Sequence, residues 1–268
     1  MSHSNFLFVW LLFALAAPAI AEEEDFHTRM VKATVKISHA RSTATGFLLT
    51  TPHEDGERSI LVTADHVLEM TPGDETTVEF RIQEGEGEYR KEIVKLLIRK
   101  EGKPLWAKHA TEDVAAIRID PPKNTVLPKI PLDCLASDAS LKQHKVHPGE
   151  ILTCLGYPHR NEANEAGFPI LRAGPIGSFP LVPTQKLKTF FLSANTFEGD
   201  SGGPVYLSRP PTPPDLATVD LILGVISAQR FLDEEMKMVY GTTKIRHRLG
   251  LAIVIHASFI KETIDLLP

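Results

Sequence analysis

The segment that most constrains this chain is a glycine-rich loop around one serine, with the sequence Glu198-Gly199-Asp200-Ser201-Gly202-Gly203-Pro204. Glycine permits backbone conformations and close approaches that a Cβ atom would block. In such a loop the amides of Gly199 and Ser201 can point at one spot beside the serine hydroxyl. Acyl transfer needs a nucleophile together with preorganised donors where oxyanion charge develops. The segment therefore favours an acyl-transfer site, with a tight turn between two strands as the alternative.

A second motif ends at a histidine. Residues 60–67 read Ile-Leu-Val-Thr-Ala-Asp-His-Val, an apolar and β-prone run that leads into small and polar residues and then His66. A neutral imidazole beside a serine hydroxyl can take its proton as attack begins and return it to the leaving group. A lone histidine at a strand end is more often structural, so this motif gains its meaning from the others.

A third motif supplies a carboxylate. Residues 111–119 read Thr-Glu-Asp-Val-Ala-Ala-Ile-Arg-Ile, with Asp113 at the start of an apolar run. A carboxylate here can accept a hydrogen bond from the far nitrogen of His66, fix its tautomer and stabilise the imidazolium. Glu112 is the nearest rival, but strand alternation directs its side chain to the opposite face. The pattern therefore favours Asp113.

Together the three motifs resemble those of the chymotrypsin-like (trypsin-like) serine peptidases. The string Gly-Asp-Ser-Gly-Gly-Pro resembles their nucleophile loop, and residues 63–66 resemble their Thr-Ala-Ala-His segment, with Asp65 as a departure. The order along the chain, His66 then Asp113 then Ser201, is that of chymotrypsin and not that of subtilisin or the α/β-hydrolases.

Further segments are similar to the bacterial HtrA-like branch of this family. They are residues 44–49, 155–158, 170–177 and 249–255. The resemblance covers about residues 30–265 and leaves no residues for a PDZ domain after the peptidase unit. We therefore expect an HtrA-like peptidase unit without a PDZ domain.

The resemblance implies an all-β fold of two six-stranded antiparallel β-barrels with a short C-terminal helix. It also implies a serine endopeptidase that acts on polypeptides through an acyl-enzyme intermediate and needs no cofactor. In this interpretation Ser201 is the nucleophile, His66 the general base and Asp113 its orienting carboxylate. The amides of Gly199 and Ser201 form the oxyanion hole. A catalytically silent binding or regulatory protein, and an esterase for small acyl esters, remain as alternatives.

The spacing of apolar and turn residues agrees with such a fold. Short runs predict strands in the first half at residues 31–37, 45–50, 60–63, 77–82, 89–98 and 113–119. They predict strands in the second half at residues 150–156, 169–173, 188–193, 203–207, 221–227, 236–240 and 250–255. Residues 231–241 predict a long charged hairpin, and residues 257–267 have helical spacing.

The domain boundaries follow from composition. Residues 120–148 contain five prolines, which predicts an interdomain connection without regular structure. We expect a signal peptide at residues 1–21 and an N-terminal barrel at residues 22–125 that carries His66 and Asp113. A connection at residues 126–148 would then lead to a C-terminal barrel at residues 149–268, which carries Ser201 and the terminal helix.

The N-terminal segment has the features of a targeting signal. Residues 6–20 form a continuous apolar run, and Ala19-Ile20-Ala21 fits a small-x-small cleavage site before the acidic residues 22–25. The run is short for a membrane span. Because no Lys or Arg precedes it, a retained N-terminal anchor is the alternative. In both cases we expect export, to the periplasm or outside the cell.

Charge and histidine spacing argue against other classes of function. The net charge is −5 and no basic block stands out, so nothing supports nucleic-acid binding. The closest metal-ligand candidates are His144 with His147 and His109 with Asp113. Neither has the spacing of a strong metal site, and we expect no metal.

Two further features concern stability and activation. In an exported protein a disulfide between Cys134 and Cys154 is possible, with buried free thiols as the alternative. The digestive members of the family are activated when cleavage frees an Ile-Val-Gly-Gly terminus, which pairs with the aspartate before the nucleophile. This chain has no such sequence, so Asp200 needs another partner.

The resemblance also implies a primary specificity pocket beside the nucleophile loop. Counting back from the nucleophile places Asn195 near the base of the pocket, with Thr196 next to it. Ser227 would lie at the wall near the triad carboxylate, and Gly250 would form another wall. Because Asn195 is neutral, we expect a small-to-medium uncharged residue on the acyl side of the scissile bond. A loop position that never touches substrate is the alternative for Asn195.

Overall fold

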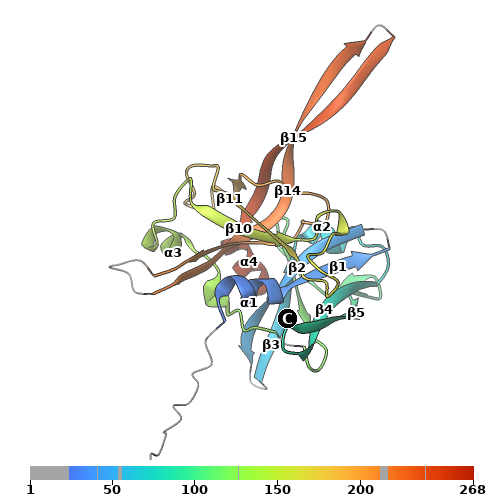
Figure 1. The fold of residues 1–268 in the computed structure, drawn as a ribbon, viewed down its shortest axis with the longest axis vertical. Coiled ribbons are helices and arrows are strands. Elements are labelled where there is room, and N and C mark those ends of the chain that lie inside the picture. The colour runs from blue at the N-terminus through green and yellow to red at the C-terminus, as the bar shows by residue number, and fades with distance from the viewer. Residues whose placement is uncertain (1–23, 41, 54–55, 126, 212–216, 239) are drawn as a thin grey trace, which may run out of the picture.

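The computed structural model describes residues 24–40, 42–53, 56–125, 127–211, 217–238 and 240–268. The predicted signal peptide, residues 1–21, lies outside the described residues. Two antiparallel β-sheets, formed by successive halves of the chain, make up most of this part (Figure 1). No helix in this part of the chain combines the length and the apolar character needed to cross a membrane.

The first sheet contains seven strands in the order β5-β4-β1-β2-β3-β9-β8. All its neighbouring strands pair antiparallel. Next to it lies a small ladder of β6 (Arg99–Lys100) and β7 (Lys103–Pro104). The strands of the first sheet are β1 (Thr34–His39), β2 (Ser42–His53), β3 (Gly56–Thr63), β4 (Glu75–Gly85), β5 (Glu88–Leu97), β8 (Ala107–Lys108) and β9 (Ala115–Ile119).

The second sheet contains six strands in the order β11-β10-β13-β14-β15-β12, followed by helix α4 (Ala257–Ile264). This architecture confirms the predicted all-β, chymotrypsin-like fold with a short C-terminal helix. The first sheet differs in having a seventh strand, the two-residue β8. The strands of the second sheet are β10 (Ile151–Gly156), β11 (Ile170–Pro175), β12 (Thr189–Leu192), β13 (Pro204–Arg209), β14 (Val219–Met238) and β15 (Gly241–His256).

Helix α1 (Phe26–Ala33) replaces the first part of the strand predicted at residues 31–37, so that prediction is wrong before Thr34. The Asp25 side chain accepts a hydrogen bond from the Thr28 N–H at 3.0 Å and caps the helix. Phe26 and Met30 are buried one turn apart. This cap and this buried face stabilise a helix where a short apolar run alone favoured a strand.

The connection between the halves contains more regular structure than its prolines predicted. A 3₁₀ turn, η1 (Leu132–Cys134), precedes helix α3 (Asp138–Gln143). Ser137 and Ser140 form a reciprocal cap at the start of α3. Two more short elements lie near the junction of the halves, helix α2 (Asp65–Glu69) and the 3₁₀ turn η2 (Pro158–Arg160).

One large cluster of buried apolar side chains runs across both halves. It includes Phe47 and Val62 of the first sheet together with Leu152 and Val225 of the second sheet, none of which is exposed to solvent. A second cluster around Phe80 fills the interior of the first sheet. Because the larger cluster is shared, the two halves pack directly on each other, and the loops at their junction are held in place.

Strands β14 and β15 continue past the body of the molecule as a two-stranded ribbon (Figure 1). The hairpin predicted at residues 231–241 is therefore confirmed, but its ladder is longer and extends from Phe231 paired with Arg248 to Met238 paired with Gly241. Almost all described side chains of this ribbon, residues 231–238 and 240–248, are exposed.

Candidate active site

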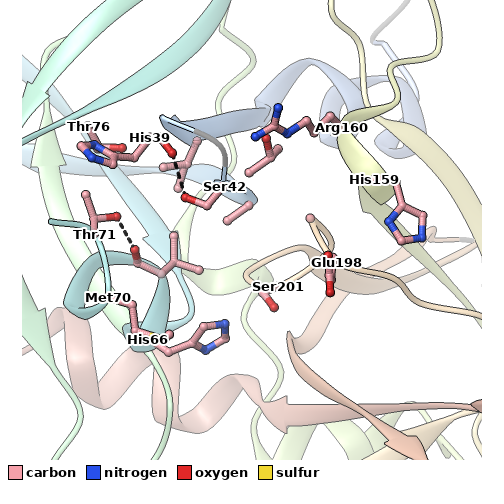
Figure 2. Close-up of a pocket in the computed structure, with 15 residues that line it drawn as sticks. His39, Ser42, His66, Met70, Thr71, Thr76, His159, Arg160, Glu198 and Ser201 are labelled. Atoms are coloured by element: carbon pink, nitrogen blue, oxygen red, sulfur yellow. Dashed lines mark hydrogen bonds between the residues drawn. The ribbon is translucent and has the colours of Figure 1, made fainter. Parts of the chain in front are cut away.

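A cavity of about 540 Å³ lies at the junction of the two halves (Figure 2). The first half contributes the adjoining ends of β1 and β2 and helix α2, including Ser42 and His66. The second half contributes His159 and Arg160 of η2 and the nucleophile loop with Ser201. The cavity therefore brings together two residues that are far apart in the sequence, His66 and Ser201.

Asp113 makes two hydrogen bonds to His66. The Asp113 Oδ2 atom lies 2.7 Å from His66 Nδ1, and Oδ1 accepts the backbone N–H of His66 at 2.9 Å. The second contact satisfies an N–H in the first turn of α2, which has no partner inside the helix. One carboxylate thus holds both the start of the helix and the ring of its histidine.

The environment of Asp113 keeps its carboxylate charged. Burial alone would raise the pKa of Asp113, but hydrogen bonds from His66 and from the Ser227 hydroxyl at 2.6 Å outweigh it. The pKa of Asp113 therefore lies below its ordinary value. A charged acceptor at Nδ1 favours the tautomer in which Nδ1 carries the proton and Nε2 is free to accept one.

The Ser201 hydroxyl and the His66 imidazole line the same cavity and extend toward each other (Figure 2). No hydrogen bond joins them, although both residues belong to the described part of the chain. Such contacts are often long in structures without substrate and tighten only when substrate binds.

The nucleophile loop is anchored from both halves of the molecule. On one side the Thr45 hydroxyl donates to the Gly199 carbonyl at 2.6 Å, and the Thr45 N–H donates to the Ser201 carbonyl at 2.9 Å. On the other side the Gly202 N–H donates to the Ile226 carbonyl of β14 at 2.7 Å. Gly202 has φ +85°, and a Cβ there would collide with the Thr45 carbonyl, so only glycine fits.

The amides of Gly199 and Ser201 are directed away from the protein's own acceptors. The His159 N–H donates to the Glu198 carbonyl at 2.7 Å. Because C=O and N–H of one trans peptide point in opposite directions, this contact turns the Gly199 N–H away from η2. Neither the Gly199 nor the Ser201 N–H donates to a backbone carbonyl in the described residues. Both amides can therefore donate to a ligand oxygen.

Asp200, the residue before Ser201, is fully buried and forms an ion pair with Arg172 of β11. The guanidinium donates to both carboxylate oxygens, each at 2.6 Å, and the Phe197 N–H adds a third hydrogen bond at 2.7 Å. Arg172 also donates to the Asn195 carbonyl at 3.1 Å. No feature of the sequence identified this partner; a bidentate arginine supplies the positive charge that a buried aspartate requires.

A smaller cavity of about 220 Å³ also borders Ser201. Of the predicted pocket residues only Thr196 lines it, and the Thr196 hydroxyl is buried without a hydrogen-bond partner. The remaining walls are formed by residues outside the four predicted pocket positions; they are Phe197, Glu198, Ile226, Ala228, Gln229 and Phe231.

The other predicted pocket residues lie elsewhere. Asn195 is exposed and does not line this cavity, as the alternative interpretation allowed. The Ser227 hydroxyl bonds to Asp113 instead of facing a ligand. Gly250, at φ +66°, lies beside the Asn195 side chain, outside both cavities.

Two other carboxylates near the site have partners of their own. Glu112 accepts a hydrogen bond from Lys188 at 2.5 Å, so it is directed away from His66. Asp65 accepts the Trp106 indole N–H at 2.8 Å, and burial raises the pKa of its carboxyl. Asp65, which departs from the Thr-Ala-Ala-His pattern, therefore contacts Trp106 within the first half.

The cysteines are both free thiols, so the possible disulfide between Cys134 and Cys154 is not formed. Cys154 is buried in β10, whereas Cys134 lies in η1 of the connection. Burial raises the pKa of each thiol to about 11. Across the described residues, no group of three His, Cys, Asp or Glu side chains is placed to hold a metal ion.

Comparison with known proteins gives the family. A solved structure similar to this chain is Rv3671c from M. tuberculosis H37Rv, a serine-to-alanine mutant in its inactive form. It has 16% sequence identity and a TM-score of 0.48, and the match covers 96% of this chain and 97% of that chain. No curated protein matches at a significant level. The family model described as trypsin-like peptidase domain matches residues 44–209, more than half of the chain. This protein therefore belongs to the family of trypsin-like peptidase domains.

Proposed function

We propose that this protein is an exported serine endopeptidase that hydrolyses peptide bonds through an acyl-enzyme intermediate. Ser201 Oγ attacks the carbonyl carbon of the scissile bond while His66 Nε2 takes the hydroxyl proton. His66 then gives this proton to the leaving amine, and a water molecule repeats the sequence to release the acid. Asp113 holds the ring and stabilises the imidazolium, and the amides of Gly199 and Ser201 bind the oxyanion.

One observation carries this proposal: the imidazole that Asp113 orients lines the same cavity as Ser201. A serine hydroxyl is a weak nucleophile unless a base is within reach. The anchored loop adds support, because two amides without a backbone acceptor lie beside the hydroxyl. The buried pair of Arg172 and Asp200 gives this loop a partner that does not depend on a freed N-terminus.

In this proposal the smaller cavity binds the side chain on the acyl side of the scissile bond. It holds about 220 Å³ and its walls include Phe197 and Phe231. The only lining carboxylate is Glu198, which is exposed and also lines the larger cavity. The unpartnered Thr196 hydroxyl can bond to a polar group. We therefore assign a small-to-medium uncharged residue to this cavity, with polar side chains preferred over apolar ones of the same size.

The cellular location and the domain boundaries complete the proposal. The apolar run at residues 6–20 and the site at Ala19-Ile20-Ala21 support cleavage by a signal peptidase and export. The N-terminal barrel, residues 22–125, supplies His66 and Asp113. The C-terminal barrel, residues 149–268, supplies Ser201.

Cleavage of a proteome-derived peptide library by the purified protein tests the proposal. We expect hydrolysis of internal peptide bonds by the wild-type protein and none by the Ser201→Ala variant. A panel of small acyl esters beside the peptides separates an esterase from a peptidase. A folded wild-type protein that cleaves neither class would favour the catalytically silent alternative.

A further inference from the structure

The ribbon of β14 and β15 has an open backbone edge that begins at the candidate active site. Strand β13 pairs with β14 only as far as Val225. The next residue, Ile226, exchanges hydrogen bonds with Gly202 and Gly203 of the nucleophile loop. From Ser227 to Met238 no described strand pairs with this edge, and β15 covers only the opposite edge.

This open edge is longer than a typical strand. At about 3.3 Å per residue, the stretch from Ser227 to Met238 reaches roughly 40 Å from the nucleophile. Such an edge presents a row of N–H and C=O groups that can pair with an extended polypeptide. The ribbon is solvent-exposed, so nothing in the described part of the chain occupies it (Figure 1).

The two faces of the ribbon differ in polarity. Residues on alternate positions of a strand share a face, as do residues directly opposite in the register. One face carries Leu232, Met236 and Met238, which are 56%, 46% and 59% exposed, together with an ion pair of Glu234 and His247 at 2.9 Å. The other face carries cross-strand ion pairs, Asp233 with Arg246 and Glu235 with Lys244. A strand added to the edge would place alternate side chains beside the face that carries Leu232, Met236 and Met238.

The chemistry of the site decides which part of a substrate would lie along this edge. The leaving amine must lie beside the imidazole that protonates it. His66 lines the larger cavity and not the smaller one, whose walls include Ala228 and Gln229 of β14. The leaving half of the substrate therefore occupies the larger cavity, and the acyl half, which is the N-terminal half, runs along β14.

We propose that the ribbon binds the extended N-terminal portion of the polypeptide substrate as an added β-strand, well beyond the residues next to the scissile bond. This inference rests on the proposed function. It predicts substrates that are unstructured over about ten residues upstream of the cleavage site, with apolar side chains at alternate positions. The occupant is a substrate segment, because the open edge is continuous with the site of attack at Ser201.

A ladder of peptides with four, eight or twelve residues upstream of one scissile bond tests the proposal. The upstream residues alternate valine and lysine, and the leaving group is the same in all. We expect kcat/KM of the wild-type protein to rise at least tenfold from four to twelve residues. A twelve-residue peptide with alternate upstream nitrogens methylated should behave like the shortest peptide, because it cannot pair along the edge.

A ribbon-shortened variant provides the matched protein. Residues 232–247 are replaced by Asn-Gly, a two-residue turn that joins Phe231 to its register partner Arg248. This variant should cleave all three peptides at the rate the wild-type protein shows for the shortest one. A second variant, Leu232→Ser with Met236→Ser, keeps the ribbon. In this variant the logarithm of the ratio of kcat/KM between the longest and shortest peptides should be about half of the wild-type value. Equal length dependence in wild-type and shortened proteins would overturn the proposal.

A binding measurement separates this inference from the proposed function. In the Ser201→Ala background, the fluorescent twelve-residue peptide should bind at least fivefold more weakly to the shortened variant than to the full ribbon. If the wild-type protein cleaves nothing but this difference holds, the proposed function fails and the ribbon still binds polypeptide. If shortening leaves peptide binding unchanged but converts a dimer to a monomer in sedimentation, the edge pairs with a second copy and the inference is wrong.

Discussion

At the scale of single residues, Asp113 holds His66 in place, and its carboxylate accepts three hydrogen bonds. It accepts hydrogen bonds from the backbone and ring of His66 and from the Ser227 hydroxyl. The choice of Asp113 over Glu112 rested on strand alternation, and Glu112 lies on the Lys188 side, as that argument requires. Both residues lie in a bend before β9, so the side chains diverge as predicted although neither residue belongs to the strand.

The variant Asp113→Asn tests the orienting role. It removes the charge and favours the wrong imidazole tautomer, so kcat should fall by about 10⁴-fold while KM stays within a few fold. Steady-state kinetics on the best library peptide measures this. Glu112→Gln is the matched control and should keep kcat within about threefold. A loss of similar size in both variants would indicate a general effect of charge and not orientation by Asp113.

Arg172 illustrates what the sequence could not reveal. The missing activation sequence predicted that Asp200 needs a partner, but nothing in the spacing pointed to a residue of β11. The pairing depends on how β10 and β11 pack beneath the nucleophile loop, where Gly156 lets the Asp200 carboxylate approach. Such a long-range contact is decided by tertiary structure and leaves no local pattern.

Replacing Arg172 with methionine leaves the buried Asp200 charge unpaired. The free energy of unfolding should fall by about 3–5 kcal/mol, measured by urea denaturation at pH 7. In parallel, kcat/KM should fall at least tenfold, because the loop that presents the oxyanion amides loses its anchor. The double variant Arg172→Met with Asp200→Asn should recover part of the stability. If the single variant is as stable as wild type, the pair does not hold the loop.

At the scale of elements, the sequence predicted the positions of most strands to within a few residues, because prolines and glycines separate one apolar run from the next. Helices α1 and α3 were missed, since each is short and depends on a cap and on tertiary packing. The full length of β14 was also missed. Residues 231–238 are exposed on both faces, so they lack the alternation of a half-buried strand.

The junction of β15 and α4 contains a buried histidine that links stability to pH. His256 is 2% exposed and packs against Phe190, and burial lowers the pKa of His256 from 6.5 to about 4. As pH falls from 6.5 to 4, the unfolded chain gains a proton that the folded chain does not. The contribution to the free energy of unfolding is therefore complete above pH 6.5 and declines by up to roughly 3 kcal/mol toward pH 4.

Urea denaturation of wild type and His256→Leu between pH 4 and pH 7.5 measures this contribution. The difference in the free energy of unfolding between the two proteins should change in the variant's favour as the pH falls. A difference that is independent of pH would show that His256 is protonated equally in both states.

At the scale of the whole molecule, stability depends on a core shared by both halves and not on a disulfide. The sequence could predict two β-rich halves from turn spacing and from the family resemblance. It could not decide between bonded and free cysteines, because two positions in a chain do not give a distance. Nor could it predict the geometry of the junction, which sets both cavities.

The thiol content tests the absence of a bond between the cysteines. Titration with Ellman's reagent in denaturant, without reductant, should detect two thiols per chain. The folded protein at pH 8 should react slowly, because burial raises the pKa of both thiols to about 11. Detection of no thiols in denaturant would contradict the free state of Cys134 and Cys154.

The central claim is that residues from the two halves converge to make Ser201 a nucleophile. Intact-mass spectrometry after treatment with diisopropyl fluorophosphate tests it most directly. The account predicts one covalent adduct per folded chain, located on the peptide that contains Ser201, and a rate at least a hundredfold lower in the His66→Ala variant. A folded wild-type protein that gains no adduct, or gains it at another residue, would contradict the account.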